Sequence, residues 1–579
     1  MPLKVYFIQN RLPLSIGLTC LLVVDFLQLL IPLVIKKAID ALTLNKATSG
    51  ILLNYGMIIL TIAFLIAALR YIWRLFIIGH SRKVEEMLRN SLFQHLETLS
   101  LSFYQRTKTG DIMARSINDI MAVRMATGMG LVSLIDGLVI GIVAICFMIY
   151  INPYLTLMSL IPAPFVIYFA KMFTRRMSTG YETVQKSFSD LTEKIREAFA
   201  GIRVVKTFLR ESWEHQRVEE EGKKYISENM KLARTIAFFF PMMTLFTNLG
   251  LAIVIWFGGR LTILGHTTTG DFVAFIGYLN LLTWPMMAMG WVTNLFQRGA
   301  ASMRRINRIL EEVPEITAPV MSQNIRPPTD FIEFRRLCIK YPEKTEYALK
   351  EISLTIEIGQ TVSLVGQVGS GKTTLLYAMP RLIDVQKGSI LIDGKDIRDF
   401  PLKDLRKNIG FVTQDTFLFS DTIRNNVVFG RNDISEEALE IALKTARIYD
   451  EIQSLERGLD TILGERGMTL SGGQRQRLTI ARAIVFDPPI LVLDDSLSMV
   501  DTRTEENILN RILTLRKDRT NFIVSHRLST ISRADLIAVL DNGELVEVGD
   551  HKTLLNNRNE FARLYERQLL AQELKIGVG

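Results

Sequence analysis

The sequence predicts an α-helical transmembrane domain of six helices with long cytoplasmic extensions, fused to a C-terminal α/β domain. Before Pro314 several apolar runs reach about twenty residues, the length that a helix needs to cross a bilayer core of roughly 30 Å. A stretch rich in proline and polar residues follows at 314–330, which we expect to be a linker. Beyond it, short apolar strands alternate with helical stretches, as in α/β domains.

The six expected spans lie within a transmembrane domain of residues 1–313. They cover residues 13–35, 52–78, 127–150, 153–173, 236–259 and 272–298. The first is not expected to be a cleavable signal peptide, because its apolar stretch is too long and lacks a small-residue cleavage site.

Lysine and arginine predict the orientation of these spans. They are dense between spans 2 and 3 and between spans 4 and 5, whereas the connection at 152–153 is uncharged. Lys36, Lys37 and Lys46 conflict mildly with this scheme, since it places them outside. We therefore expect a multi-pass protein of the cytoplasmic (inner) membrane with its C-terminal domain in the cytoplasm. The net charge of +9 fits basic loops beside anionic lipid and requires no nucleic-acid partner.

The two long cytoplasmic segments are not loop-like in composition. Apolar residues recur at helical spacing, as at Val184, Phe188 and Leu191. We interpret the segments as continuations of spans 2 to 5, with a short non-helical hinge near 103–111 and another near 201–208. Ordinary amphipathic helices with solvated faces are the alternative. The three cysteines are isolated from one another and indicate neither a metal site nor a disulfide framework.

A phosphate-binding loop of the form GxxxxGKT occupies residues 366–373, between an apolar strand at 361–365 and a helical pattern from Thr374. Its backbone N–H groups and the helix N-terminus would bind phosphate oxygens, with Lys372 on the β- and γ-phosphates and Thr373 on Mg²⁺. ATP and Mg²⁺ are therefore the expected cofactors. The residues expected to bind the nucleotide here are Gly366, Gln367, Val368, Gly369, Ser370, Gly371, Lys372, Thr373 and Thr374.

The remaining strands predict a nucleotide-binding domain over 331–570, followed by a tail at 571–579. The expected strands are 390–392, 409–412, 490–493, 521–524 and 536–540, with a more helical insert at about 435–484.

The LSGGQ run at 470–474 resembles the signature of one nucleotide-hydrolase family, the ATP-binding cassettes (ABC). As a helix N-terminus it would bind an anion through Ser471, Gly472, Gly473 and Gln474. In this family the signature closes on ATP bound to the opposite cassette. One phosphate-binding loop, one signature and six spans thus imply half a transporter. The resemblance also implies that the segments near 103–111 and 201–208 flank coupling helices.

Other positions match the family's motifs. The strand ending at Asp494 resembles a Walker B motif, whose carboxylate holds Mg²⁺. Gln414 resembles the Q-loop glutamine that touches Mg²⁺ and the attacking water. Tyr341 resembles the aromatic that stacks on adenine; a packing aromatic at a strand edge is the alternative. Asp501 resembles the D-loop aspartate, and His526 the switch histidine near the γ-phosphate.

Asp495 departs from the family pattern, which has glutamate there as the residue that polarises water. An aspartate is one methylene shorter, and losing a general base typically costs about 10²–10⁴ in rate. The resemblance is therefore to the degenerate-site subunit of bacterial heterodimeric multidrug-type exporters. The alternative is that aspartate works in place of glutamate in a homodimer.

The resemblance implies ATP-driven export of hydrophobic or amphipathic small molecules, with a second half-transporter as the partner. A lipid flippase is an alternative that would have much the same sequence. An ATP-gated channel or regulator is a more remote alternative, because the sequence shows no pore or regulatory segment. Four charged residues within the spans would face a cavity, pair with one another or serve the packing. They are Asp25, Arg70, Arg74 and Asp136.

Overall fold

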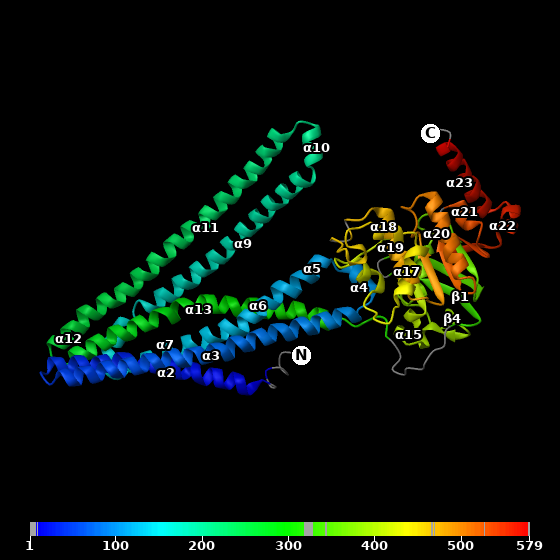
Figure 1. Ribbon diagram of the computed structural model, residues 1–579. Helices are drawn as coiled ribbons and strands as arrows, with labels where there is room; N and C mark the ends of the chain where they lie inside the picture. The colour runs from blue at the N-terminus through cyan, green and yellow to red at the C-terminus, as the bar shows by residue number, and fades with distance from the viewer. Residues whose placement is uncertain are drawn as a thin grey trace. The chain divides into compact units, whose positions relative to one another are not determined.

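The computed structural model describes residue 7 and residues 10–317, 328–341, 344–464, 467, 469–525 and 527–576. The chain forms two compact units (Figure 1). The first consists of Met1–Thr98 and Thr107–Glu312, and the second of Leu99–Arg106 and Val313–Gly579. A short segment from the N-terminal half of the chain thus packs with the C-terminal unit. Part of the expected linker, at 318–327, and the last three residues of the tail lie outside the described residues.

The first unit contains six helices long and apolar enough to cross a membrane, and each contains one of the six expected spans, which confirms the helical membrane domain. They are Arg11–Thr43, Ser49–Thr98, Thr109–Ile151, Pro153–Ala200, Glu211–Ile263 and Thr269–Leu310. The second has 50 residues, which corresponds to about 75 Å at 1.5 Å per residue. That is more than twice the thickness of a bilayer core, so the helix continues well beyond the apolar segment.

Local irregularities divide some of these helices. The regular elements are α2 (Arg11–Thr43), α3 (Ser49–Thr98), α5 (Thr109–Ala114), α6 (Ile120–Met125), α7 (Leu131–Ile151), α8 (Pro153–Ser159), α9 (Ala163–Ala200), α10 (Ile202–Thr207), α11 (Glu211–Ile253), α12 (Gly259–Ile263) and α13 (Thr269–Leu310). Three π-helical segments, η1 (Arg115–Asp119), η2 (Ala126–Gly130) and η3 (Val254–Gly258), connect pieces of the third and fifth helices. Such π-turns interrupt a helix without ending it.

The far ends of the cytoplasmic extensions differ from the expected non-helical hinges. Each contains a six-residue helix instead, α4 (Leu101–Arg106) at one end and α10 at the other, with short breaks on either side. Helix α10 begins after Gly201, and Leu209 has a φ of +52°, a left-handed conformation that cannot continue a right-handed helix.

Polar contacts join distant helices of the first unit. The Lys36 ammonium lies 2.5 Å from the Asp271 carboxylate, and the Asp40 carboxylate accepts a hydrogen bond of 2.8 Å from the Gly270 N–H. The buried Tyr278 hydroxyl donates a hydrogen bond of 2.9 Å to the Leu29 carbonyl. These contacts hold α13 against α2.

The second unit contains two sheets. The strands are β1 (Phe331–Ile339), β2 (Leu349–Glu357), β3 (Thr361–Val365), β4 (Ile390–Ile392), β5 (Lys395–Asp396), β6 (Ile409–Val412), β7 (Ile490–Asp494), β8 (Thr520–Val524), β9 (Leu536–Asp541) and β10 (Glu544–Gly549). One sheet has the order β2-β1-β4-β5, with antiparallel pairs. The other has the order β10-β9-β3-β8-β7-β6, parallel except for β10. All six strands that the sequence predicts are present.

The helices of this unit follow the α/β pattern. They are α14 (Lys372–Ala378), α15 (Leu402–Lys407), α16 (Ile423–Val428), α17 (Glu436–Thr445), α18 (Tyr449–Gln453), α19 (Gly472–Ile484), α20 (Thr502–Leu515), α21 (Leu528–Ile531), α22 (His551–Asn557) and α23 (Glu560–Ile576), with short 3₁₀ turns η4 (Ile397–Asp399) and η5 (Gly458–Asp460). Helices α17 to α19 constitute the helical insert expected at about 435–484.

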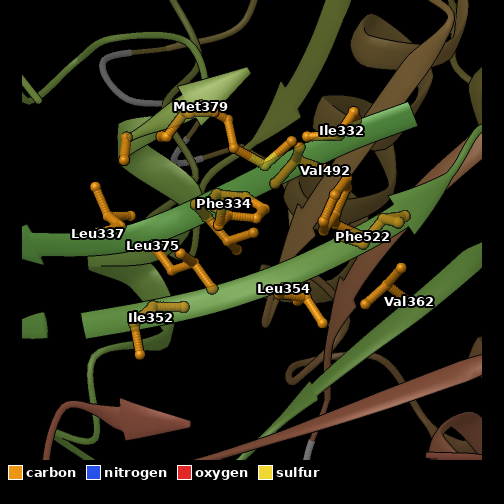
Figure 2. Close-up of a cluster of buried hydrophobic side chains, with 14 of the residues drawn as sticks. Ile332, Phe334, Leu337, Ile352, Leu354, Val362, Leu375, Met379, Val492 and Phe522 are labelled. Atoms are coloured by element: carbon orange, nitrogen blue, oxygen red, sulfur yellow. The ribbon is translucent and has the colours of Figure 1, made fainter. Parts of the chain in front are cut away.

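A continuous apolar core joins the two sheets and helix α14 (Figure 2). Phe334 of β1 and Phe522 of β8 are each 1% exposed, and Leu375 of α14 packs in the same cluster. Because β3 and α14 are both packed in this core, the loop that connects them is held at both ends.

Replacing Phe334 by alanine should reduce the free energy of unfolding of the second unit by about 3–5 kcal/mol, since the large buried ring leaves a cavity. Denaturant unfolding of the detergent-solubilised chain measures this change. The partly exposed Ile441 on α17 provides the control, because Ile441→Ala should change that free energy by about 0.5 kcal/mol or less. Equal effects of the two substitutions would contradict the assigned core.

Candidate functional site

A cavity of about 830 Å³ lies in the second unit at the carboxyl ends of β3 and β7. This volume is within the roughly 300–1,000 Å³ of small-molecule sites. Ten of the residues predicted to bind nucleotide or metal or to act in catalysis line it: Tyr341, Val368, Gly369, Gly371, Lys372, Thr373, Thr374, Gln414, Asp494 and Asp495. The sequence therefore identified most of one coherent site, although its segments are far apart along the chain.

The phosphate-binding loop is held by its own backbone. The Lys372 ammonium donates hydrogen bonds to the carbonyls of Gly366 (2.9 Å) and Gln367 (2.7 Å). Burial lowers the pKa of Lys372 below its ordinary value, while the neighbouring Asp494 and Asp495 carboxylates oppose that shift. The mostly buried ammonium thus lies at the N-terminus of helix α14, where it can attract phosphate oxygens.

Two glycines of this loop cannot be replaced without moving the backbone. A Cβ on Gly366 would lie 2.2 Å from the Leu540 carbonyl oxygen. Gly371 has a φ of +103°, and a Cβ there would lie 2.8 Å from the Ala348 carbonyl oxygen. Side chains rarely adopt that conformation, so the tight turn into α14 requires glycine.

Thr373 and Asp494 form the expected metal-binding pair. The Thr373 hydroxyl donates a hydrogen bond of 3.3 Å to Asp494 Oδ1, and Asp494 is 1% exposed. Among the described residues its Oδ2 atom has no hydrogen-bond partner. Burial raises the pKa of Asp494 above its ordinary value. A buried carboxylate oxygen without a donor, beside a hydroxyl and above a phosphate-binding loop, fits the oxygen ligands that Mg²⁺ prefers.

Asp495 follows β7 directly and has a left-handed backbone, with a φ of +45°. Such a conformation costs a non-glycine residue about 1–3 kcal/mol and occurs often at functional sites. Its backbone N–H donates to the Val524 carbonyl at 3.2 Å, which ties it to β8. Asp495 lines the cavity together with Gln414, the other residue expected to orient water.

Tyr341 lies opposite the loop, with its hydroxyl 3.1 Å from the Thr374 hydroxyl. Sequence reasoning missed other lining residues, above all Ser102, Gln105 and Arg106 of helix α4. Helix α4 is anchored in the same unit, because the Ser102 hydroxyl donates to Glu315 at 2.5 Å. The sequence of this segment indicates only a resemblance to those that flank coupling helices, and no local signal marks it as part of the cavity wall.

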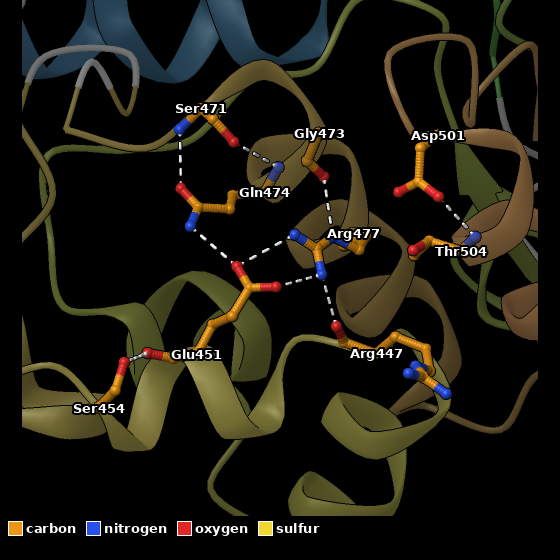
Figure 3. A network of polar contacts seen from close by, with 9 residues as sticks. All are labelled: Arg447, Glu451, Ser454, Ser471, Gly473, Gln474, Arg477, Asp501 and Thr504. Carbon is orange, nitrogen blue, oxygen red and sulfur yellow. Dashed lines mark hydrogen bonds and ion pairs between the residues drawn. The ribbon is translucent and has the colours of Figure 1, made fainter.

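The signature segment lies elsewhere in the same unit. Ser471 is the N-cap of α19 and forms a capping box with Gln474, whose side chain accepts a hydrogen bond of 2.8 Å from the Ser471 N–H (Figure 3). The Ser471 hydroxyl oxygen accepts from the Gln474 N–H at 3.2 Å. Its own proton is therefore free to donate to an anion at this helix N-terminus. Residues Ser471 to Gln474 do not line the cavity that holds the phosphate-binding loop.

Glu451 of α18 anchors the signature helix (Figure 3). Its carboxylate accepts hydrogen bonds from Gln474 (2.8 Å) and from two Arg477 nitrogens (2.6 and 3.0 Å). Burial works against ionisation, but these donors outweigh it and hold the pKa of Glu451 below its ordinary value. No sequence pattern indicated this residue, because its partners lie more than twenty positions away.

Arg527 joins the switch segment to the D-loop and to helix α20. Asp501 caps α20 by accepting from the Thr504 N–H at 2.9 Å and does not line the cavity. Arg527 forms an ion pair with the buried Glu505 carboxylate and donates to the Val500 carbonyl at 2.8 Å. His526, the expected switch residue, lies outside the described residues. Its neighbour Arg527 nevertheless connects this segment to the D-loop.

Comparisons with known proteins match both parts of the chain. The family described as "ABC transporter transmembrane region" matches residues 14–286, and the family described as "ABC transporter" matches residues 349–498. Among the solved structures, a bacterial Atm1-family ABC exporter with ATP bound has a TM-score of 0.79 and 27% identity. That similarity covers 96% of this chain and 98% of the other.

Curated relatives match over nearly the full length. The probable multidrug resistance ABC transporter ATP-binding/permease protein YheI of Bacillus subtilis is 35% identical over 99% of this chain and 98% of its own. An ATP-dependent lipid A-core flippase of Syntrophus aciditrophicus is 34% identical over 97% of this chain and 93% of its own.

Replacing Tyr341 by alanine should weaken ATP binding about 5- to 150-fold, because base–aromatic stacking contributes about 1–3 kcal/mol. Tyr341→Phe keeps the ring and loses only the contact with Thr374, so it should bind ATP within about threefold of wild type. Calorimetric titration of the solubilised full-length chain measures both. Wild-type affinity in the alanine variant would show that the ring packs without stacking on the base.

Proposed function

Because this chain belongs to the ABC transporter family, we propose that it is one half of an exporter for hydrophobic or amphipathic small molecules. The matched cassette makes the protein an ATPase coupled to transport. The six long helices place it in the cytoplasmic membrane, with the ATP-binding domain in the cytoplasm as in bacterial exporters.

One observation carries the proposal of a half-transporter. The phosphate-binding loop and the signature segment occupy the same compact unit, but the signature residues do not line the loop's cavity. A single cassette therefore does not enclose its own ATP. ABC exporters act as dimers, in which the signature of each subunit covers the nucleotide on the other.

The residues of the cavity have complementary roles in this proposal. Lys372 and the loop N–H groups bind the phosphates, Tyr341 stacks on the base, and Gln414 orients the attacking water. Thr373 and Asp494 would hold Mg²⁺, which neutralises charge on the phosphate oxygens when bound. Ser471 and the α19 N-terminus would complete the site of the partner subunit.

We further propose that the partner is a different chain. The short side chain of Asp495 would hold its carboxylate too far back to align water, and 1 Å of displacement can cost about 10² in rate. The site on this chain would then retain ATP for longer, while its intact signature serves a competent site on the partner. The strained backbone at Asp495 supports a position tuned for function rather than for folding alone.

A lipid flippase is the second candidate, since one relative is named as a lipid A-core flippase. Stimulation of ATP hydrolysis by a panel of drugs and lipids separates the two candidates. Activation by drugs favours the multidrug exporter, and activation confined to lipids favours the flippase.

The Asp495→Glu substitution should raise ATP hydrolysis by the native complex about twofold or more, because it adds a second competent site. The matched Asp495→Asn variant should leave hydrolysis near the wild-type rate, since this carboxylate contributes little. Phosphate release by the purified complex measures both rates.

Native mass spectrometry of the complex isolated from its own cells provides the independent check. Two different polypeptides of similar mass would support the heterodimer. A complex of twice the chain mass that contains one kind of polypeptide would indicate a homodimer. If Asp495→Asn then lowers the rate of ATP hydrolysis 10²-fold or more, Asp495 is the working base, because removal of a general base costs about 10²–10⁴ in rate.

The Glu451→Gln substitution should lower hydrolysis by the complex about tenfold. It weakens the bonds that hold Gln474 and Arg477, and a hydrogen bond to a charged group contributes about 1.5–3 kcal/mol. ATP binding at this chain's own loop should not change, because Glu451 does not line that cavity. The exposed Glu456 is the control, and an equal effect of Glu456→Gln would refute the anchoring role.

A further inference from the structure

Asp25 is a fully buried carboxylate in the middle of helix α2. Its side chain is 0% exposed, and neither carboxylate oxygen has a hydrogen-bond partner among the described residues. An isolated ionised carboxylate without donors is strongly unfavourable in an apolar interior. Residues of this kind within a membrane span usually serve a function.

The surroundings of Asp25 come from three helices. One buried apolar cluster contains Val24 from α2, Trp73 from α3 and Val132 from α7, with Leu69 and Ile135 packed against it. Asp25, Arg70 and Asp136 each lie four residues after a member of this cluster, namely Leu21, Ile66 and Val132, and so share a helix face with it. The cluster therefore brings these three charged residues to one place in the bundle.

Two charged side chains act on Asp25, and they have opposite signs. The Asp136 carboxylate of α7 acts on Asp25 more strongly than does Arg70 of α3, whose charge is opposite. Neither carboxylate has an ion-pair partner within 4.0 Å among the described residues, and the Arg74 guanidinium lies over the Trp73 ring at 5.7 Å. Helix α13, which also packs on α2, has no charged residue between Asp271 and Arg298.

Two ionised carboxylates close together in an apolar cluster repel each other, and neither offers a donor. A single proton resolves both problems, because it neutralises one carboxylate and donates a hydrogen bond to the other. Arg70 can then balance the one remaining negative charge from a distance. The local arrangement thus requires one bound proton rather than none or two.

We propose that Asp25 and Asp136 hold one proton between them, so that they form a protonation site inside the transmembrane domain. The two residues belong to different helices, so any rearrangement that separates α2 from α7 also separates the two carboxylates and releases the proton. The conformation of the bundle is then linked to pH. This proposal does not depend on the substrate or on the identity of the partner subunit.

Infrared spectroscopy of the full-length protein in lipid nanodiscs tests the site directly. A protonated carboxylic acid has a carbonyl stretch separate from that of a carboxylate, and labelling aspartate with carbon-13 shifts it. We expect the wild-type protein to show this band at neutral pH and the Asp25→Asn variant to lack it. Asparagine resembles the protonated acid, so the variant should keep its unfolding temperature.

Two further variants should move the titration of this band in opposite directions. Asp136→Asn removes the neighbouring negative charge, so the band should disappear at a pH about 1–3 units lower than in wild type. Arg70→Gln removes the positive charge, so the band should persist to a higher pH. A merely structural role for Asp25 predicts no such opposed shifts.

Absence of the band from the wild-type protein at neutral pH would overturn the proposal, as would shifts of the same sign in folded Asp136→Asn and Arg70→Gln variants. If the band is absent and sodium chloride, but not choline chloride, raises the unfolding temperature, the pair binds a metal cation instead of a proton.

Discussion

The contact between the Thr373 hydroxyl and the Asp494 carboxylate is the interaction on which the nucleotide site depends. These residues are 121 positions apart, and their side chains meet only because β3 and β7 flank β8 in one parallel sheet. Parallel strands present their carboxyl ends at the same edge of a sheet, where α/β domains bind ligands. The loop after β3, the acidic pair after β7 and the segment after β8 therefore converge by topology. A shift of one strand would separate the loop from the carboxylate that completes it.

Much of the fold could be predicted because its signals are local. The six predicted strands, β3, β4, β6, β7, β8 and β9, are short and largely buried apolar runs, and their predicted limits differ from the structure by one residue at most. Strands β1 and β2 were not predicted: their buried and exposed residues mix, and β1 contains a bulge after Phe334. The prediction of non-helical hinges at the ends of the cytoplasmic extensions was wrong, because a six-residue helix is too short to show a helical period of apolar residues.

The site could also be predicted only where its signals are local in the sequence. The phosphate-binding loop, Asp494 and the signature are contiguous motifs, each with chemistry that its own residues explain. Glu451 and the helix α4 residues contribute through contacts between distant segments, which no sequence window contains. Glu505, the buried ion-pair partner of Arg527, also contributes through a contact between segments that are distant in the sequence.

The division of the chain into its two units has a mechanical consequence. The backbone passes between them at three places: after Thr98, after Arg106 and after Glu312. A domain joined to its neighbour by one backbone connection can rotate freely, whereas three backbone connections transmit the rotation. The three connections follow the end of α3, precede α5 and follow the end of α13. Rotation of the cassette is therefore imposed through covalent bonds on the second, third and sixth membrane helices. The first, fourth and fifth helices have no such crossing within their own chain, so the motion reaches them only through the rest of the membrane unit.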